Sequence, residues 1–151
     1  MRSFKNAFSM LELIMVIVII GILSAIAIPR FAASRDDAQI AKARTTVAAI
    51  RSAIGAEKQK RILRGNFVAI TTLGDNGDNV FDTFDNGTER VVEYSVRGCE
   101  EENRGCWTTN KTGADTEYTY RLPSSTEEVV FKVEGNRFIC QTTPGNCDRL
   151  E

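Results

Sequence analysis

Glu12 is the one charged residue in a stretch of apolar side chains that runs from Phe8 to Ile28. After it come sixteen residues, Leu13 to Ile28, in which Ser24 is the only polar side chain. As a helix rising ~1.5 Å per residue, Phe8 to Ile28 would span roughly 32 Å, enough to cross the hydrocarbon core of a bilayer. A carboxylate at the bilayer centre costs about 2.5–3.5 kcal/mol on insertion scales, and less near an interface. A charge kept at that cost predicts a function for Glu12.

Three ordinary kinds of segment could account for such a stretch. A cleaved secretory signal has a shorter apolar region and a small-x-small cleavage site, whereas this run is long and ends at Pro29-Arg30-Phe31. A helix that is apolar on all sides could be the core of a soluble protein, but the rest of the chain is not apolar enough to surround it. A single-span membrane anchor explains everything except Glu12 and the seven residues before Phe8.

Those seven residues, Met1 to Ala7, carry two positive charges and no negative one. The positive-inside rule predicts that they stay in the cytoplasm and that the bulk of the chain lies outside the membrane. Basic leader, carboxylate and apolar run together resemble the type IV prepilin family of pilins, minor pilins and type II secretion pseudopilins. The resemblance implies a leader at residues 1–7, cut by a prepilin peptidase between Ala7 and Phe8, and N-methylation of Phe8. Ala7 stands where the family usually has glycine, and its small side chain is expected to fit a peptidase pocket that excludes bulk.

The resemblance also assigns roles inside the filament. Within one helix the new Phe8 amine and Glu12 lie about 6 Å apart along the axis, so a carboxylate of an adjacent subunit can serve as the partner of the amine. The family implies this pairing between subunits. It also implies that the helix melts between Gly21 and Pro29 on assembly; a plain kink in a continuous helix is the alternative for the isolated subunit.

The amphipathic pattern beyond Pro29 predicts that the helix continues to Arg64. Apolar residues recur at spacings of three and four, the period of one helical face; they are Ile40, Ala43, Val47, Ile50 and Ile54. Four regions are expected: a leader at 1–7, a transmembrane or filament-core helix at 8–29, an amphipathic continuation at 30–64 and a globular β-rich head at 65–151. The predicted fold class is α+β, a pilin-like architecture in which a long amino-terminal helix packs on a small antiparallel sheet.

Four segments of the head are predicted to be strands, because apolar and β-branched residues alternate with polar ones. They are Arg90–Arg97, Thr116–Leu122, Glu127–Val133 and Arg137–Gln141. Glu134-Gly135-Asn136 is expected to form the hairpin loop between the last two. Phe67 to Thr88 is expected to be a loop-rich connection.

The four cysteines form two C-x6-C pairs, Cys99 with Cys106 and Cys140 with Cys147, on the outward side of the predicted span. An oxidising periplasm favours disulfides there. Four cysteines allow three pairings; local closure is preferred because turn-forming residues lie inside each pair, and cross-links between the pairs are the main alternative. Zinc is disfavoured, because short C-x2-C knuckles are missing and the chain has no histidine.

An acidic loop raises the question of calcium. Oxygen ligands suit Ca²⁺, and the candidates are Asp75, Asp78, Asp82 and Asp85. The spacing does not fit an EF-hand frame, and acidic turns rich in Gly and Asn are also ordinary solvated loops. The solvated loop is favoured, so no cofactor is expected apart from this possible Ca²⁺.

Charge is distributed unevenly around a net value of −1. From Ala32 to Arg64 eight basic and three acidic residues give +5, and from Gly65 to Glu151 eight basic and sixteen acidic residues give −8. Such a division can steer packing between subunits in a salt-sensitive way, or both faces can be merely solvated. The acidic head argues against nucleic-acid binding. Catalysis is not expected, since histidine, a G-x-S-x-G elbow and a phosphate-binding glycine loop are all missing.

These observations leave three hypotheses. The favoured one is a structural subunit of a type IV pilus-like filament, specifically a type II secretion pseudopilin. The second is a minor pilin acting in adhesion, filament priming or DNA uptake, and the third is a membrane-anchored periplasmic domain that never polymerises. The expected partners are other copies, other pilin-like subunits, a prepilin peptidase, the inner-membrane assembly platform and lipid. The expected location is the inner membrane, crossed once, with the head in the periplasm and then on the filament or cell surface.

Overall fold

The computed structural model describes residues 8–74, 79–100, 103–112, 115–141 and 144–151. The chain divides into two compact units, Met1–Arg35 and Asp36–Glu151. One helix, α1 (Met10–Leu63), contributes to both. The predicted leader, including Ala7, lies outside the described residues.

In the amino-terminal unit, α1 starts with a serine cap. The Ser9 Oγ accepts a hydrogen bond from the Leu11 amide at 3.3 Å, and the Ser9 carbonyl accepts one from the Leu13 amide at 3.1 Å. These bonds use amides that the first turn of a helix cannot satisfy by itself. Gly21 and Pro29 both lie within α1, and the helix continues through both positions. In this single chain the stretch between them is therefore helical, and melting on assembly stays a prediction.

In the second unit, one face of α1 is buried against the head. Ala43, Val47, Ile50 and Ile54 are each no more than 2 % exposed, and Ile40 is partly buried against them. Their spacing places them on one side of the helix. The apolar face predicted from the sequence is confirmed.

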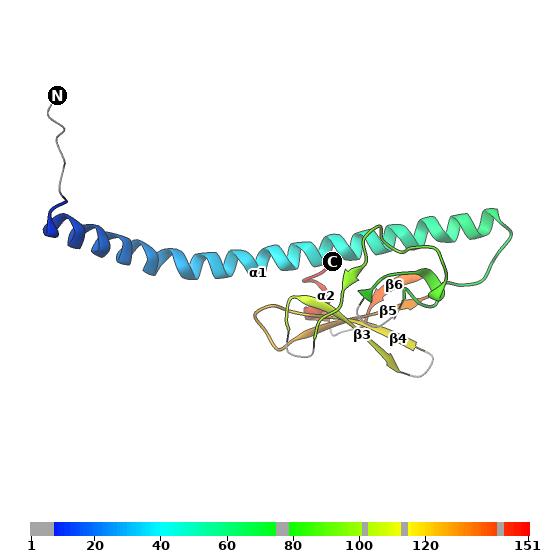
Figure 1. Ribbon diagram of the computed structural model, residues 1–151. Helices are drawn as coiled ribbons and strands as arrows, with labels where there is room; N and C mark the ends of the chain where they lie inside the picture. The colour runs from blue at the N-terminus through cyan, green and yellow to red at the C-terminus, as the bar shows by residue number, and fades with distance from the viewer. Residues whose placement is uncertain (1–7, 75–78, 101–102, 113–114, 142–143) are drawn as a thin grey trace, which may run out of the picture. The chain divides into compact units, whose positions relative to one another are not determined.

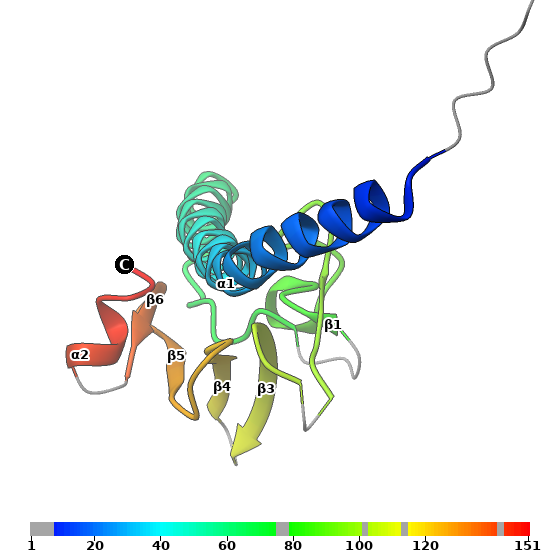
Figure 2. The ribbon, with the colours of Figure 1, turned by 90° about the vertical axis from the view of Figure 1, so that its left-hand side faces the viewer.

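The head is built on an antiparallel sheet of order β3-β4-β5-β6. Its strands are β3 (Cys106–Thr112), β4 (Asp115–Arg121), β5 (Glu128–Glu134) and β6 (Arg137–Cys140). Figures 1 and 2 show this sheet lying beside the second half of α1. A two-stranded sheet joins β1 (Asn79–Val80) to β2 (Val96–Arg97). The short helices are η1 (Phe84–Asn86) and α2 (Pro144–Cys147).

An aromatic cluster fills the space between the sheet and the loop that follows α1. Phe81 lies at its centre, with ring centroids 5.1 Å from Trp107, 5.1 Å from Tyr118 and 5.8 Å from Phe138. Phe131 stacks on Phe138 at 4.8 Å. Phe81 is fully buried at a φ of 62°, a conformation that a bulky residue rarely adopts. Packing of the ring on its neighbours therefore holds the backbone there.

The predicted fold class is confirmed; among the strands, one prediction is wrong and two strands, β1 and β3, were not predicted. Arg90–Arg97 is wrong as one strand: only Val96–Arg97 is a strand, whereas Val91 is buried in the loop core and its amide donates to the Asp82 carbonyl at 3.0 Å. Strand β3 was missed, and Phe67–Thr88 contains β1 and η1 in addition to loops. The hairpin expected at Glu134-Gly135-Asn136 is confirmed, since Glu134 pairs with Arg137 across a turn of two positive-φ residues.

Candidate functional site

The apolar side chains in the amino-terminal segment, from Phe8 into the first half of α1, are exposed among the residues that the structure describes. Phe8 is 72 % exposed, Leu11 71 % and Ile19 54 %. A window of this helix has a mean hydropathy of 2.9 and none of it is buried, so by length and composition it can cross a membrane. Exposure of this much apolar surface to water is unfavourable, so the segment requires lipid or other protein around it.

Glu12 lies in the first turn of this helix, four residues after Phe8. The Glu12 side chain is exposed and forms no ion pair with another described residue. Once surrounded by lipid or protein, an ionised carboxylate without a partner is costly. The geometry thus leaves Glu12 available to a cation from outside its own chain.

At the other end of α1, an ion-pair cluster holds the loop that follows the helix. Arg61 Nε lies 2.9 Å from Glu57 Oε1, and Arg61 Nη1 lies 2.8 Å from Asp85 Oδ2. The other oxygen of Asp85 accepts the Thr71 and Thr72 amides at 2.7 Å and 3.0 Å. This carboxylate therefore joins the last turns of α1 to the loop.

The same contacts shift the titration of both partners. Burial by itself favours the neutral carboxyl, but the hydrogen bonds from the Thr71 and Thr72 amides and from Arg61 outweigh it and hold the pKa of Asp85 below its ordinary value. Burial by itself lowers the pKa of Arg61, but its hydrogen bonds to Glu57 and Asp85 raise that pKa overall. The ion pair is charged at neutral pH.

Of the four carboxylates predicted as a calcium loop, Asp75 and Asp78 lie outside the described residues. Asp85 is engaged by amides and by the positive charge of Arg61, which a cation at that carboxylate would have to face. Asp82 is partly buried, and its carbonyl accepts the Val91 amide. Within the part of the chain that the structure describes, no group of three or more His, Cys, Asp or Glu side chains is placed to hold a metal ion.

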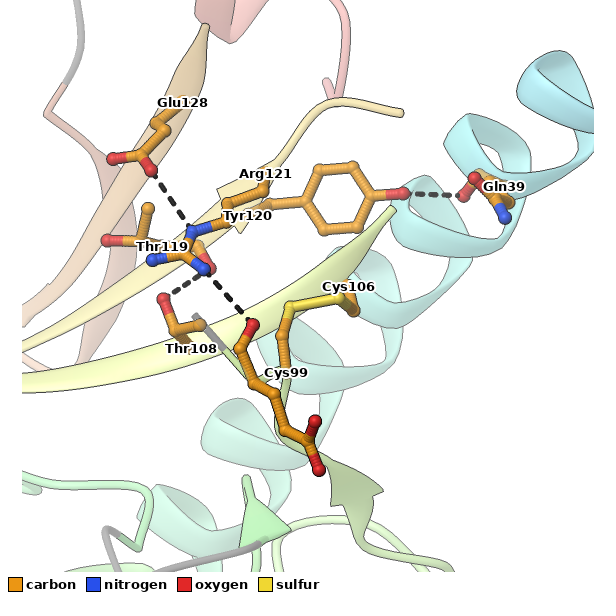
Figure 3. The surroundings of a disulfide bond; sticks show 9 residues. Gln39, Cys99, Cys106, Thr108, Thr119, Tyr120, Arg121 and Glu128 are labelled. Atoms are coloured by element: carbon orange, nitrogen blue, oxygen red, sulfur yellow. Dashed lines mark hydrogen bonds and ion pairs between the residues drawn. A yellow bond between two sulfur atoms is a disulfide. The ribbon is translucent and has the colours of Figure 1, made fainter. Parts of the chain in front are cut away.

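The cysteines are joined locally, Cys99 to Cys106 and Cys140 to Cys147, which is the pairing preferred from the sequence. Figure 3 shows the first disulfide beside α1, close to Gln39. The Tyr120 hydroxyl donates to the Gln39 carbonyl at 3.1 Å, and burial raises the pKa of this tyrosine. Gly105 lies against the Gln39 side chain at a φ of 76°, where a Cβ would overlap the amide group. The disulfide loop is thereby fixed to the helix.

Several basic residues of α1 pair with acidic residues of their own head. Lys60 lies 2.5 Å from Glu89, and Arg51 lies 2.5 Å from Glu151. These pairs are largely exposed, so each contributes little to stability. Part of the charge division seen in the sequence is thus used within one chain.

Comparison with known proteins supports the reading of the amino-terminal segment. The family described as the prokaryotic N-terminal methylation motif matches residues 2–28. The predicted resemblance to type IV prepilins is confirmed by this match and by two pilin relatives.

The first relative is the type IV narrow pilus major component PilA5 of Thermus thermophilus, which is 56 % identical over 48 residues, 32 % of this chain and 41 % of the relative. The second is the type IV major fimbrial protein FimA of Dichelobacter nodosus, 33 % identical over 93 residues, 61 % of this chain and 57 % of the relative. The chain thus spans about half the length of the curated relatives it matches. No solved structure gives a significant match.

The sequence interpretation missed the Arg61–Asp85 contact. Its two residues are 24 positions apart, and nothing in their local spacing pairs them. The sequence offered one signal, the type of residue at position 85. Asp and Asn tolerate the left-handed conformation and are therefore common in turns, and Asp85 adopts that conformation with a φ of 49°.

Proposed function

Starting from the methylation motif at residues 2–28, we propose that this chain is a structural subunit of a type IV pilus-like filament. The observation that carries the proposal is an apolar helix that its own chain leaves exposed, with Glu12 lying one turn after the predicted new amino terminus. Lipid can cover the apolar surface before assembly, and neighbouring subunits can cover it afterwards. No ordinary membrane anchor needs the carboxylate.

The proposed chemistry has two steps, cleavage of the leader and then ion pairing between subunits. A prepilin peptidase cuts between Ala7 and Phe8 on the cytoplasmic side, and the Phe8 amine carries a positive charge. The amine of one subunit then pairs with Glu12 of an adjacent one within the filament core. Breaking such a buried pair by removing one charge costs about 3–5 kcal/mol, because the other charge is left without a partner.

The location and the further partners follow from the same proposal. The basic residues Arg2 and Lys5 keep the amino terminus in the cytoplasm, and the head with its two disulfides lies in the periplasm. Before assembly the subunits are embedded in the inner membrane, where they contact the assembly platform, and they reach the cell surface as part of the filament. Gly21 and Pro29 are the positions where the helix is proposed to loosen as a subunit leaves the bilayer.

Two kinds of filament are candidates, a type IV pilus and a type II secretion pseudopilus. The relatives are named as a pilus component and a fimbrial protein, which supports a pilus. The short head, which led the sequence interpretation to favour a type II secretion pseudopilin, supports the pseudopilus less strongly. Recovery of the chain as the abundant subunit of sheared surface filaments is expected for the pilus, whereas loss of secreted cargo without surface filaments would identify the pseudopilus.

The role of Glu12 is tested with two matched substitutions. Glu12→Gln keeps the size and removes the charge, whereas Glu12→Asp keeps the charge on a shorter side chain. We expect the glutamine variant to insert in the membrane and lose assembly by about a hundredfold or more, and the aspartate variant to retain part of it. The measurement is the amount of chain in sheared filaments relative to the membrane fraction.

Mass spectrometry of the wild-type subunit is the second test of the proposed function. The proposal requires a chain that begins at methylated Phe8 and contains two disulfides. Filaments built from chains that retain Met1, or normal assembly of the Glu12→Gln variant, would contradict it.

A further inference from the structure

One face of α1 within the amino-terminal unit changes from apolar to polar along the helix axis. A groove of ≈ 520 Å³ lies on this face. Its lining residues have the spacing of one side of a helix; they are Leu23, Ile26, Ala27, Arg30, Phe31 and Ser34. The first three are apolar, whereas Arg30 and Ser34 are polar and follow them. The groove therefore has an apolar end and a cationic end.

The cationic end offers donors that its own chain does not use. Arg30 is the only charged residue that lines the groove. It is exposed and forms no ion pair with another described residue. Ser34, one turn further along the helix, is also exposed. A guanidinium presents a planar fork of N–H donors that matches a phosphate, and a hydroxyl can donate to the same group.

The acidic residues that follow the groove lie outside it. Asp36 and Asp37 come six and seven residues after Arg30, roughly 9–10 Å further along the helix. Both belong to the second unit, and the Asp36 carboxylate accepts a hydrogen bond from the Ser124 hydroxyl. Arg35, which lies between Arg30 and these acids, adds a second exposed positive charge to the amino-terminal unit. The charge at the groove itself is therefore positive.

The position of Arg30 along the helix matches the edge of a bilayer. Phe8 to Ile28 spans roughly 32 Å as a helix, and a hydrocarbon core is about 30 Å thick. With this run placed across the core, Leu23 and Ile26, which are 61 % and 67 % exposed, lie at the depth of the acyl chains. Arg30 then lies where the headgroup layer begins, and a long basic side chain near a helix end extends toward that layer.

We propose that this groove binds a phospholipid of the periplasmic leaflet. Arg30 and Ser34 hold the phosphate, and an acyl chain lies along the apolar end. The inference rests on the membrane stage of the proposed function, and it identifies the ligand that would hold the subunit at a fixed depth before assembly. A phospholipid is the occupant because the groove offers a cation and an apolar surface in the order, and at the depth, in which a phospholipid presents its phosphate and its chains.

Solid-state NMR of the full-length chain in phospholipid vesicles tests whether Arg30 contacts the phosphate. The guanidinium carbons are isotope-labelled, and the loss of their signal on recoupling to phosphorus reports arginines that lie against a phosphate. We expect Arg30→Gln to reduce this loss. Arg149→Gln removes the same charge from an exposed residue of the head and should leave it unchanged. An equal loss in wild type and Arg30→Gln would overturn the proposal.

Native mass spectrometry of the full-length chain in detergent identifies the ligand. The probes are phosphatidylglycerol, the diacylglycerol with the same chains but no phosphate, and glycerol phosphate, which has no chains. We expect phosphatidylglycerol to be retained, Arg30→Gln to lower its occupancy about fivefold, and Arg30→Lys to keep about half or more of it. Equal retention of diacylglycerol would mean that the phosphate is not recognised, and equal retention of glycerol phosphate would mean a site for free anions; either result rejects the phospholipid.

Two controls accompany these variants. Unchanged fluorescence of Trp107, the single tryptophan, shows that the head is folded in each variant. Flotation with the vesicles shows that the apolar helix is inserted. If Arg30 contacts no phosphate in vesicles and instead crosslinks to another subunit in filaments, the face belongs to a second copy and the lipid site is wrong.

The two proposals fail in different ways. A wild-type chain that floats with vesicles but retains no phosphatidylglycerol rejects the lipid site and leaves the filament function intact. A wild-type chain that does not insert in vesicles, or that is never found in a filament, rejects the proposed function itself.

Discussion

Two isoleucines on one helix show how the two units of this protein differ. Ile19 is 54 % exposed and Ile50 is fully buried, although both lie in α1. Up to Arg35 the described apolar side chains of the helix are largely exposed, whereas from Asp36 on one face of it is buried against the head. The residue type is the same, so the difference lies in what the rest of the sequence supplies around it.

This contrast separates where each unit obtains its stability. The head buries aromatic and aliphatic side chains against one another, and two disulfides add about 2–4 kcal/mol each through loops that close within the head. In the amino-terminal part of α1 the described apolar side chains are exposed, so backbone hydrogen bonds supply most of the stabilisation there, and these side chains need lipid or other protein around them. Changes in the first unit should therefore alter assembly, and changes in the core of the second should alter folding.

The largest effect expected on folding comes from emptying the centre of the head. Phe131 is fully buried and contacts Trp107 and Phe138, so Phe131→Ala should lower the free energy of unfolding by about 3–5 kcal/mol. Ile19→Ala removes a large side chain from the amino-terminal helix and should change it by less than about 0.5 kcal/mol. Urea unfolding of the full chain in detergent, followed by Trp107 fluorescence, measures both.

Equal destabilisation by the two substitutions would break the comparison, because it would mean that the amino-terminal helix contributes to the stability of the head. We also expect Ile19→Ala to lower the amount of assembled filament, although it hardly changes the free energy of unfolding. Shearing and quantifying filaments from the same strains provides that measurement.

The elements predicted correctly from the sequence are those whose pattern is local. The face of α1 was predictable because apolar residues recur at three and four, and β4 was predictable because Tyr118 and Tyr120 alternate with polar residues and both are buried. The amino-terminal motif is also local, since leader, carboxylate and apolar run lie within residues 2–28.

Where tertiary pairing decides the structure, the sequence interpretation was wrong or silent. Strand β3 reads Cys-Trp-Thr-Thr-Asn-Lys-Thr, which contains few apolar residues, and it is a strand because all seven of its residues pair with β4. Arg90–Arg97 has the opposite character: its valines favour a strand, but Val91 is drawn into the core beside η1. In both segments the tertiary contacts outweigh the intrinsic strand propensity of the residues.

The candidate site divides in the same way. Glu12 stands out in the sequence as the one charged residue of an apolar run, and Phe8 was predicted through the resemblance to type IV prepilins. The cluster of Glu57, Arg61 and Asp85, by contrast, depends on a loop returning to the helix. Features that depend on neighbouring residues can be predicted from a sequence, whereas contacts between distant segments cannot be predicted in the same way.

A smaller effect is expected from the carboxylate that ties the loop to α1. Asp85→Asn keeps a residue that tolerates the positive φ and removes the charge facing Arg61, and it should lower the free energy of unfolding by about 2 kcal/mol at pH 7. Because folding lowers the pKa of Asp85 from its ordinary value of 3.8, its charge stabilises the folded state above that value. The stabilisation is lost as the pH falls through the lower pKa of the folded state.

The pH dependence distinguishes this mechanism from a merely structural role. The difference in unfolding free energy between wild type and Asp85→Asn should be constant from about pH 5 to 7 and shrink below about pH 4. Urea unfolding at a series of pH values, in detergent, gives the difference directly. A difference that stays constant down to the lowest pH would exclude the ionised carboxylate as its cause.

The smallest effect concerns one hydrogen bond within the core of the head. The buried Tyr118 hydroxyl accepts the Leu73 amide at 2.7 Å and so fixes the loop that follows α1 against β4. Tyr118→Phe keeps the ring stacked on Phe81 and removes this acceptor, and it should lower the free energy of unfolding by about 1 kcal/mol. Hydrogen exchange at the Leu73 amide is the more specific measurement, because it should accelerate there while amides of β5 change only by the global amount. A uniform acceleration would instead mean that the hydroxyl acts through the packing of the whole core, so that this loop is no less stable than the sheet it covers.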